Sequence, residues 1–270
     1  NSTIIDKQLK KVTKKTSVLQ LHTKDLMVIA ASINEKEVTF TESSDDILEL
    51  NSDSVIEPGT VEIVVEFRGK ITDAMHGMYP CYFEHEGKKK KLIATQFESH
   101  HAREVFPCID EPSAKATFDL TLVTDAGETI LANTPTKSSS QEGDRVITTF
   151  ETTPRMSTYL LAFVCGEMVS KETTTKDGVL VRSWASVAQN PNVLDFSVAE
   201  AVSYIEYYND FFGVPYPLEK CDQVALPDFE SGAMENWGLI TYRETAMLSD
   251  PKNISLSTQQ LVAIVVAHEL

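Results

Sequence analysis

The residues most suggestive of chemistry lie at the end of the sequence, where residues 266–270 read V-A-H-E-L. In the helical motif H-E-x-x-H, two histidines four residues apart share one helix face and bind zinc, and the glutamate between them activates the attacking water. The sequence contains the first half of this motif, with His268 as the candidate ligand and Glu269 as the candidate general base. Alone, the pair is weak evidence, because a histidine on the buried stripe of a helix is more common.

A second motif, upstream of this pair, changes that balance. Residues 226–244 read L-P-D-F-E-S-G-A-M-E-N-W-G-L-I-T-Y-R-E. The G-A-M-E-N core and its flanks resemble the exopeptidase signature of the aminopeptidase N family of gluzincin metallopeptidases. The separation between this core and His268 is also similar to that of the family. A five-residue match with matching flanks is highly specific.

A third segment extends the resemblance toward the N-terminus. Residues 95–98 read T-Q-F-E and residues 106–112 read F-P-C-I-D-E-P, and both are similar to segments of the same family. The ordered resemblance begins near Gly77 and is greatest to the soluble bacterial members. It implies a zinc aminopeptidase that hydrolyses the N-terminal peptide bond of peptides and releases single amino acids.

The resemblance also implies residue roles. An aminopeptidase must recognise a free α-ammonium group, which carboxylates do through charge-assisted hydrogen bonds. The resemblance gives this role to Glu98 and Glu235, which are expected to converge beside the His268 helix. The other positions that it assigns to substrate binding border the first side chain or leave room for the substrate backbone: Gln96, Gly232, Ala233, Met234 and Asn236. The adjacent His100 and His101 are expected to be structural, because neighbours on a strand point to opposite faces.

The same resemblance places further zinc ligands after Leu270. The second histidine should follow His268 by four residues, and a glutamate ligand and an oxyanion-stabilising tyrosine should come later. A catalytic zinc site needs three protein ligands. The sequence is therefore expected to be an N-terminal fragment, inactive alone and unable to hold Zn²⁺ stably, of a protein that binds one Zn²⁺ per subunit.

Two alternatives stay open. A leukotriene-hydrolase-like bifunctional enzyme resembles G-G-M-E-N rather than G-A-M-E-N, so Ala233 and Glu98 favour a plain aminopeptidase. The other alternative is a non-catalytic scaffold or interaction protein of the same fold. It is disfavoured because the candidate site residues are all present: Glu98, Glu235, His268 and Glu269.

Composition narrows the partners. The formal net charge is −16, which argues against nucleic-acid binding and suits peptides with a free N-terminal amine. No apolar run approaches the roughly 18 residues that cross a bilayer. The four cysteines are widely spaced and are expected to be reduced, packed thiols, which favours a cytoplasmic location. The first residue is not Met, and the glycosylation triplets at residues 1–3 and 253–255 are interpreted as chance matches.

The elements that must position these residues fall into two parts. Residues 60–67 alternate apolar and acidic side chains, which predicts a half-buried strand. Other strands are expected at residues 17–22, 26–33, 118–122, 146–150, 159–164 and 179–185, with residues 88–91 as one arm of a hairpin. Such a series of short strands favours an antiparallel sandwich or saddle.

Helical spacing begins later in the sequence. Ser197 and Glu200 have capping-box spacing, and Gly213 is expected to end this helix. A second helix is expected from about Ser257, with an apolar face of Leu261, Ile264 and Val265 that leads to His268. We therefore predict an all-β antiparallel N-terminal domain at residues 1–186, followed at residues 187–270 by the truncated start of a thermolysin-like α/β catalytic domain.

Overall fold

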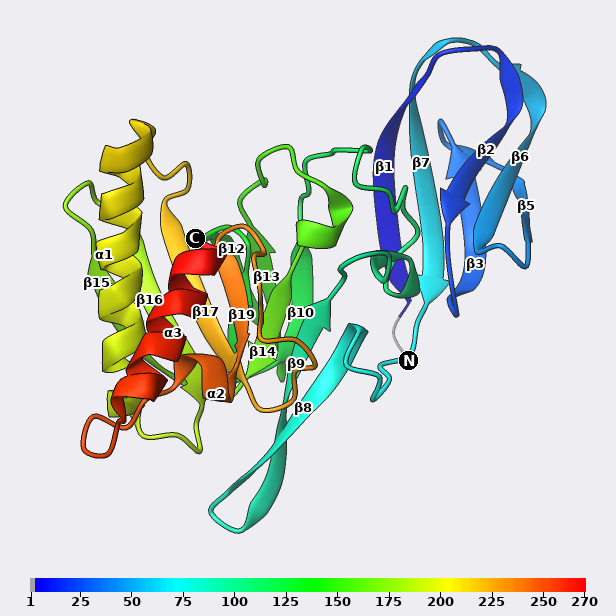
Figure 1. Ribbon diagram of the computed structural model, residues 1–270. Helices are drawn as coiled ribbons and strands as arrows, with labels where there is room; N and C mark the ends of the chain where they lie inside the picture. The colour runs from blue at the N-terminus through cyan, green and yellow to red at the C-terminus, as the bar shows by residue number, and fades with distance from the viewer. Residues whose placement is uncertain (1–2) are drawn as a thin grey trace. The chain divides into compact units, whose positions relative to one another are not determined.

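The computed structural model describes residues 3–270, so the first two residues of the predicted N-terminal domain and of the first glycosylation triplet lie outside it. The chain forms two compact units, each built from several segments (Figure 1). Unit 1 comprises Asn1–Met78, Gln96–Lys115 and Ser157–Tyr159. Unit 2 comprises Tyr79–Thr95, Ala116–Met156 and Leu160–Leu270.

Unit 1 contains a two-layer antiparallel sandwich. One sheet has the strand order β1(Ile4–Val12), β7(Gly59–Arg68), β3(Met27–Ile33) and β4(Lys36–Glu37). The other has the order β2(Thr16–His22), β6(Ile47–Ile56) and β5(Thr39–Glu42). The inward side chains of both sheets form one core, which includes Leu48, Leu50, Ile63 and Phe67. The alternation of residues 60–67 therefore predicted β7 and its buried face correctly.

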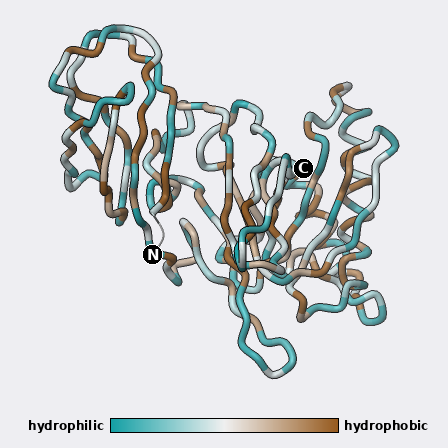
Figure 2. The backbone as a smooth tube through the Cα atoms, turned by 180° about the vertical axis from the view of Figure 1, so that it is seen from behind, coloured by the Kyte–Doolittle hydropathy of each residue, from teal (hydrophilic) through white to brown (hydrophobic). Residues whose placement is uncertain are grey.

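Two further antiparallel sheets lie mostly in unit 2. One has the order β10(Thr121–Asp125), β13(Arg145–Phe150) and β12(Thr136–Glu142). The other has the order β11(Thr129–Ala132), β14(Phe163–Gly166), β9(Lys88–Gln96) and β8(Gly77–His85). The expected hairpin is present as β8 and β9, and Figure 2 shows a hydrophilic tip. A hydrophilic tip is typical of a hairpin whose edge is exposed to solvent.

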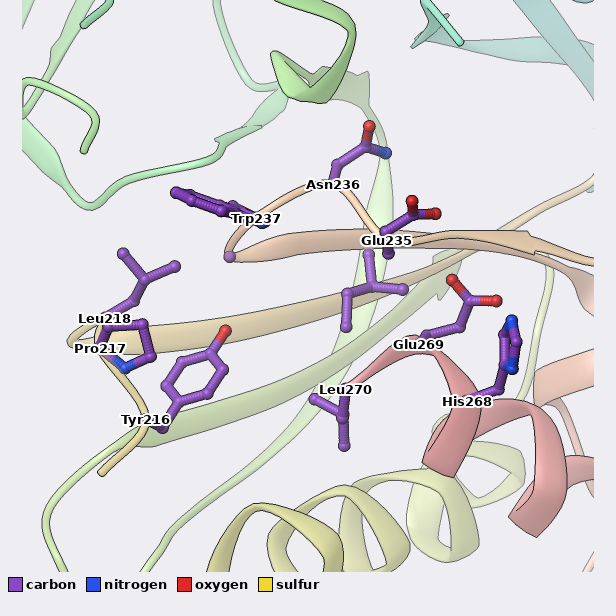
Figure 3. Close-up of a pocket in the computed structure, with 11 residues that line it drawn as sticks. Tyr216, Pro217, Leu218, Glu235, Asn236, Trp237, His268, Glu269 and Leu270 are labelled. Carbon is purple, nitrogen blue, oxygen red and sulfur yellow. The ribbon is translucent and has the colours of Figure 1, made fainter. Parts of the chain in front are cut away.

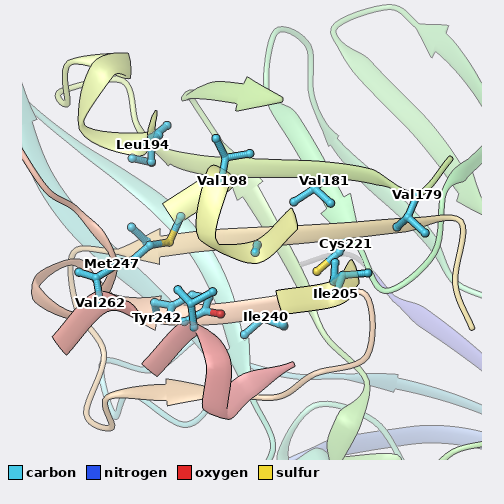
Figure 4. Close-up of a cluster of buried hydrophobic side chains, with 14 residues drawn as sticks. Val179, Val181, Leu194, Val198, Ile205, Cys221, Ile240, Tyr242, Met247 and Val262 are labelled. Atoms are coloured by element: carbon cyan, nitrogen blue, oxygen red, sulfur yellow. The ribbon is translucent and has the colours of Figure 1, made fainter. Parts of the chain in front are cut away.

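A mixed five-stranded sheet carries the C-terminal part of unit 2. Its order is β15(Met168–Thr174), β16(Leu180–Ser186), β17(Lys220–Leu226), β19(Leu239–Arg243) and β18(Ala233–Met234). β16, β17 and β19 run parallel, and the two edge pairs are antiparallel. The helices α1(Asp195–Phe212), α2(Glu244–Met247) and α3(Leu256–Glu269) join this sheet in one core (Figure 4). The predicted all-β region followed by a mixed α/β region is thus confirmed.

Four details differ from expectation. The short 3-10 helix η3(Pro191–Leu194) leads directly into α1, so Ser197 lies inside the helix and donates to the Leu194 carbonyl instead of forming a capping box. Residues 159–164 begin in another 3-10 turn, η2(Thr158–Leu160), and only their end is in β14. The strand expected at residues 118–122 begins only at Thr121, where β10 starts.

The fourth difference concerns the buried face of α3. Val262 and Val266 are fully buried, whereas Leu261 and Ile264, predicted to face the core, are exposed. Apolar residues lie on most sides of this helix, so spacing alone could not select the buried side.

All four cysteines are buried free thiols, as expected. Within residues 3–270, no helix has the length and apolar composition to span a membrane. The boundary near residue 186 stays a prediction, because the compact units are interleaved in sequence and neither ends there.

Candidate active site

The last turn of α3 carries the first candidate residues. The helix begins with a cap in which the Ser255 hydroxyl accepts from the Thr258 backbone N–H at 3.1 Å. Val262 and Val266 fix the helix on the sheet, and the Tyr208 hydroxyl of α1 donates to the Ala267 carbonyl at 2.7 Å. These contacts leave the His268 imidazole exposed at the helix end.

The second group of candidates lies on the edge strand β18 and the turn that follows it. Ala233 pairs with Tyr242 of β19, and Met234 pairs with Thr241. The turn at residues 235–238 then returns the chain to β19, where the Leu239 N–H donates to the Asn236 carbonyl at 3.0 Å. The buried Asn236 side chain donates to the Thr241 hydroxyl at 3.3 Å. Glu235 is left exposed at the start of this turn.

Buried polar groups from other segments anchor this turn, which we call the 235–238 turn. The Asn133 side-chain amide donates to the Trp237 carbonyl at 2.8 Å. Lys220 of β17 donates to the Gly238 carbonyl at 2.7 Å. Gly238 has a left-handed φ of +73°, and a Cβ there would lie 2.2 Å from the Asn133 carbonyl oxygen. The position therefore requires glycine.

Asp222 completes the support under the turn. Its fully buried carboxylate accepts two hydrogen bonds from Arg182, at 2.6 and 2.8 Å, and lies 2.8 Å from the Lys220 ammonium. The Trp184 indole donates to the same carboxylate at 2.9 Å. Burial opposes ionisation, but the neighbouring Lys220 and Arg182 outweigh it and hold the pKa of Asp222 below its usual value. This network holds the Lys220 ammonium in place, and through it the Gly238 carbonyl.

Residues 228–230, which precede β18, are held by a separate set of hydrogen bonds. Asp228 accepts from the Tyr82 N–H of β8 at 2.7 Å, and its carbonyl accepts from the Cys81 thiol at 3.3 Å. The Arg243 guanidinium donates to the carbonyls of Phe229 and Glu230. Residues 228–230 are therefore held by β8 and by Arg243, the last residue of β19.

These elements bring the two groups of candidates to one cavity of about 410 Å³ (Figure 3). Glu235 and Asn236 from the 235–238 turn, and His268 and Glu269 from α3, line it together. Its remaining lining is largely apolar: Tyr216, Pro217, Leu218, Trp237, Gly238, Ile240 and Leu270. In Figure 3 the Glu269 carboxylate lies beside the His268 ring and points toward Glu235, whose own carboxylate points away from the ring.

The charge of this cavity suits a cation. Two carboxylates and a single imidazole line it, so the site attracts positively charged groups. Behind Glu269, the fully buried Tyr242 hydroxyl has no hydrogen-bond partner among the described residues. Burial raises the pKa of Tyr242 well above its usual value, and the nearby Cys221 and Glu269 add to the effect. Tyr242 therefore stays a neutral phenol beneath the acidic cavity.

The other predicted residues do not line this cavity. Gly232 is exposed just before β18, Ala233 is half-buried against the core of the mixed sheet, and Met234 is buried. Gln96 and Glu98 belong to unit 1, where Gln96 is buried and Glu98 is exposed just after β9. The convergence of Glu98 with Glu235 stays a prediction.

Several residues that shape the site were missed by sequence reasoning. Asn133 and Lys220 are isolated polar residues, far from both motifs in sequence, and no spacing rule singles them out. Tyr216 and Leu218 lie just after the glycine that ends α1, where only a turn was expected. Trp237 was part of the recognised motif, but it had been given no role of its own.

Comparison with known protein families agrees with this geometry. Residues 2–160 match the peptidase M1 N-terminal domain, and residues 196–270 match the peptidase family M1 domain. The chain belongs to peptidase family M1. The chain thus contains segments of two M1 domains. The second segment includes every residue that the cavity brings together from the two motifs.

Curated M1 relatives are similar over nearly the whole chain. Aminopeptidase N of Lactococcus lactis subsp. lactis is 49% identical over 93% of the chain. Aminopeptidase N of Lactobacillus helveticus is 46% identical over 93%, and puromycin-sensitive aminopeptidase of Caenorhabditis elegans is 40% identical over 94%. The chain spans 30%, 29% and 28% of the lengths of these three relatives, respectively.

Proposed function

We propose that the whole protein is a zinc-dependent aminopeptidase that removes single amino acids from the N-terminus of peptides. One observation carries the proposal: Glu235 from the 235–238 turn lines the same acidic cavity as His268 and Glu269 from α3. The names of the M1 relatives support the same activity.

Glu235 is the proposed anchor for the substrate amine. Its carboxylate is exposed at the cavity, and the 235–238 turn holds the backbone on either side. A carboxylate accepts charge-assisted hydrogen bonds from an ammonium group, and these are about twice as strong as neutral ones. We assign a second carboxylate contact to Glu98, and contacts with the first residue to Gln96, Gly232, Ala233, Met234 and Asn236.

The residues present suit one position of a zinc site. His268 offers an exposed imidazole at a cavity lined by two carboxylates, and imidazole is a preferred zinc ligand. In residues 3–270, this cavity does not bring together three groups of the kind that hold a metal. The other ligands are therefore proposed to follow Leu270 in the whole protein, and the 270-residue chain is proposed to be inactive alone. When bound, zinc would polarise the scissile carbonyl.

Glu269 is the proposed general base. It follows His268 directly, and its carboxylate points into the cavity toward the space below Glu235 (Figure 3). In this role it takes a proton from the attacking water and delivers it to the leaving amine, so the proton is conserved across the step. Tyr242 and the apolar lining limit water behind the carboxylate.

Two broader assignments accompany the proposal. We place the start of the peptidase domain near residue 187, between the two matched family segments. We also propose a cytoplasmic location, which the four buried free thiols support.

The test uses the full-length protein and aminoacyl-arylamide substrates. We expect zinc-dependent release of the first residue and a loss of about 10²–10⁴-fold in kcat for Glu269→Gln, the range typical of general acid–base catalysis. Glu172→Gln, an exposed change on β15, is the control and should retain activity. Zinc-loaded protein without turnover would favour the non-catalytic scaffold, and epoxide opening would favour the leukotriene-hydrolase-like alternative.

A further inference from the structure

A second group of metal-ligating side chains lies in unit 1, and none of its members lines the His268 cavity. His76, His101 and Glu104 each place one potential ligand atom within 4.8 Å of the other two. The His76 Nδ1 lies 2.8 Å from one carboxylate oxygen of Glu104, and the His101 Nδ1 lies 3.1 Å from the other. Among residues 3–270, no other three histidine, cysteine or acidic side chains meet in this way.

The two imidazoles are arranged as a pair. Their rings stack with centroids 4.0 Å apart and an interplanar angle of 28°. The side chains are 34% exposed for His76, 20% for His101 and 12% for Glu104, so the carboxylate is sheltered while the histidines can be reached from solvent. Ring nitrogens of the two histidines therefore lie near each other, and an ion can reach them from solvent.

The backbone holds this arrangement at some cost. His76 lies between Met75 and Gly77, which have left-handed φ values of +56° and +65°. Left-handed backbone is unfavourable for a residue such as Met, and strained positions of this kind concentrate at functional sites. A Cβ at residue 77 would lie 3.2 Å from the Glu104 carboxylate, so glycine also provides room for the cluster.

The second histidine is held by a different segment. His101 lies in a turn before the 3-10 helix η1(Ala102–Glu104), not on a strand as the sequence had suggested, and its backbone N–H donates to the Phe97 carbonyl at 2.9 Å. The alternation argument that made His100 and His101 structural therefore does not apply here. His100 stacks on His101, but its Nδ1 contacts the Ser99 hydroxyl at 2.8 Å, and it is outside the cluster.

A purely structural ion pair explains only part of the cluster. Lys24 lies 2.9 Å from a Glu104 oxygen and by itself balances the charge of that carboxylate. The imidazoles of His76 and His101 also contact this carboxylate, although charge balance does not require them. Two imidazole nitrogens and one carboxylate oxygen form a donor set that suits first-row transition ions such as Zn²⁺ and Co²⁺, and not the oxygen-preferring Mg²⁺ or Ca²⁺.

We propose that His76, His101 and Glu104 form a binding site for one divalent transition-metal ion, with Zn²⁺ as the representative cation. One Glu104 oxygen ligates the ion while Lys24 neutralises the other, and water fills the open positions. The ion joins the segment around residue 76 to the turn at 101–104. This site is independent of the proposed peptidase chemistry.

The direct test measures Zn²⁺ and Co²⁺ binding to the full-length protein by calorimetry and by metal analysis after equilibrium dialysis. We expect His76→Gln and His101→Gln each to lose one ion per chain, or to bind it at least about tenfold more weakly, the lower end of the loss seen when even a supporting group of a metal site is removed. Any ion bound at the His268 cavity is common to all of these proteins and cancels in the comparison.

His100→Gln is the matched control, since it removes a neighbouring, exposed and stacked imidazole that lies outside the cluster. It should bind as the unmodified protein does. Equal binding by all four proteins, or an equal loss in His100→Gln, would overturn the proposal.

A measurement on the unmodified protein covers the case in which a variant does not fold. Histidine modification by diethyl pyrocarbonate, mapped by mass spectrometry, should slow at His76 and His101 when Zn²⁺ is added and remain unchanged at His100. Unchanged modification at all three histidines in saturating Zn²⁺ would contradict the proposal. Mg²⁺ in place of Zn²⁺ should give no protection.

Discussion

The two regions that form the cavity are held in different ways. The 235–238 turn depends on specific hydrogen bonds from Asn133 and Lys220, which are in turn fixed by buried partners. The end of α3 depends mainly on the apolar contacts of Val262 and Val266. The proposed substrate anchor is therefore positioned by directional polar bonds, whereas the proposed base is positioned by packing, which adapts more gradually to substitution.

The largest predicted effect comes from removing the charge at the centre of the polar network. Asp222→Asn leaves the buried Lys220 and the partly buried Arg182 without their counter-charge, and we expect it to cost about 3–5 kcal/mol of unfolding free energy. Urea denaturation of the full-length protein measures this. Asp195→Asn, which breaks a largely exposed pair with Lys171, should cost less than about 1 kcal/mol. Similar losses for the two variants would mean that the Asp222 network contributes no more to stability than an exposed ion pair.

The same substitution has a pH signature. Because the pKa of Asp222 is lowered in the folded state, its contribution to stability is complete above the usual aspartate pKa of about 3.9 and is lost as the pH falls through the lower, folded value. The stability difference between the unmodified protein and Asp222→Asn should therefore narrow below about pH 4. A difference that widened on acidification would contradict the assigned direction.

A smaller effect is expected from adding one methyl group inside the turn. Gly238→Ala combines left-handed backbone, at about 1–2 kcal/mol, with a clash against the Asn133 carbonyl, at about 1–3 kcal/mol. Gly213→Ala, at the end of α1, shares the left-handed φ but has no atom within 4 Å of the added Cβ. Thermal unfolding of both variants isolates the clash. Equal shifts in Tm would mean that the turn tolerates displacement.

The smallest effect is expected at the packed helix. Val266→Ala removes two buried carbon atoms and should cost about 2 kcal/mol, from about 0.8 kcal/mol for each carbon plus a cavity term. Ile264→Ala changes the exposed side of α3 and should cost less than about 0.5 kcal/mol. Unfolding free energies of the two variants would test whether packing on this face positions the helix. A larger loss of unfolding free energy for Ile264→Ala than for Val266→Ala would mean that the supporting contacts lie on the other face of the helix.

Much of this architecture could be predicted from the sequence, and the failures have definite physical causes. Alternation at residues 60–67 identified β7 because that strand has one buried face. Periodicity did not identify the buried face of α3. Leu261, Val262 and Ile264 are all apolar, and only tertiary packing determines which of them is buried.

The candidate site shows a similar division. Its chemical residues, Glu235, His268 and Glu269, were identified by resemblance to a known motif, and the structure brings them to one cavity. Their supports were not identified, because Asn133 and Lys220 act through hydrogen bonds to distant backbone carbonyls. Such partners depend on the folded arrangement and leave no periodic pattern in the sequence.

The most direct test of the central claim, that Glu235 anchors a charged amine at the cavity of His268 and Glu269, is a substrate comparison in the full-length protein. The measurement is kcat/KM for a leucyl-arylamide and for its analogue without the amino group, with the unmodified protein and with Glu235→Gln. A charged hydrogen bond contributes about 1.5–3 kcal/mol, so Glu235→Gln should reduce the preference for the free amine roughly tenfold to a hundredfold. An unchanged preference would contradict the account.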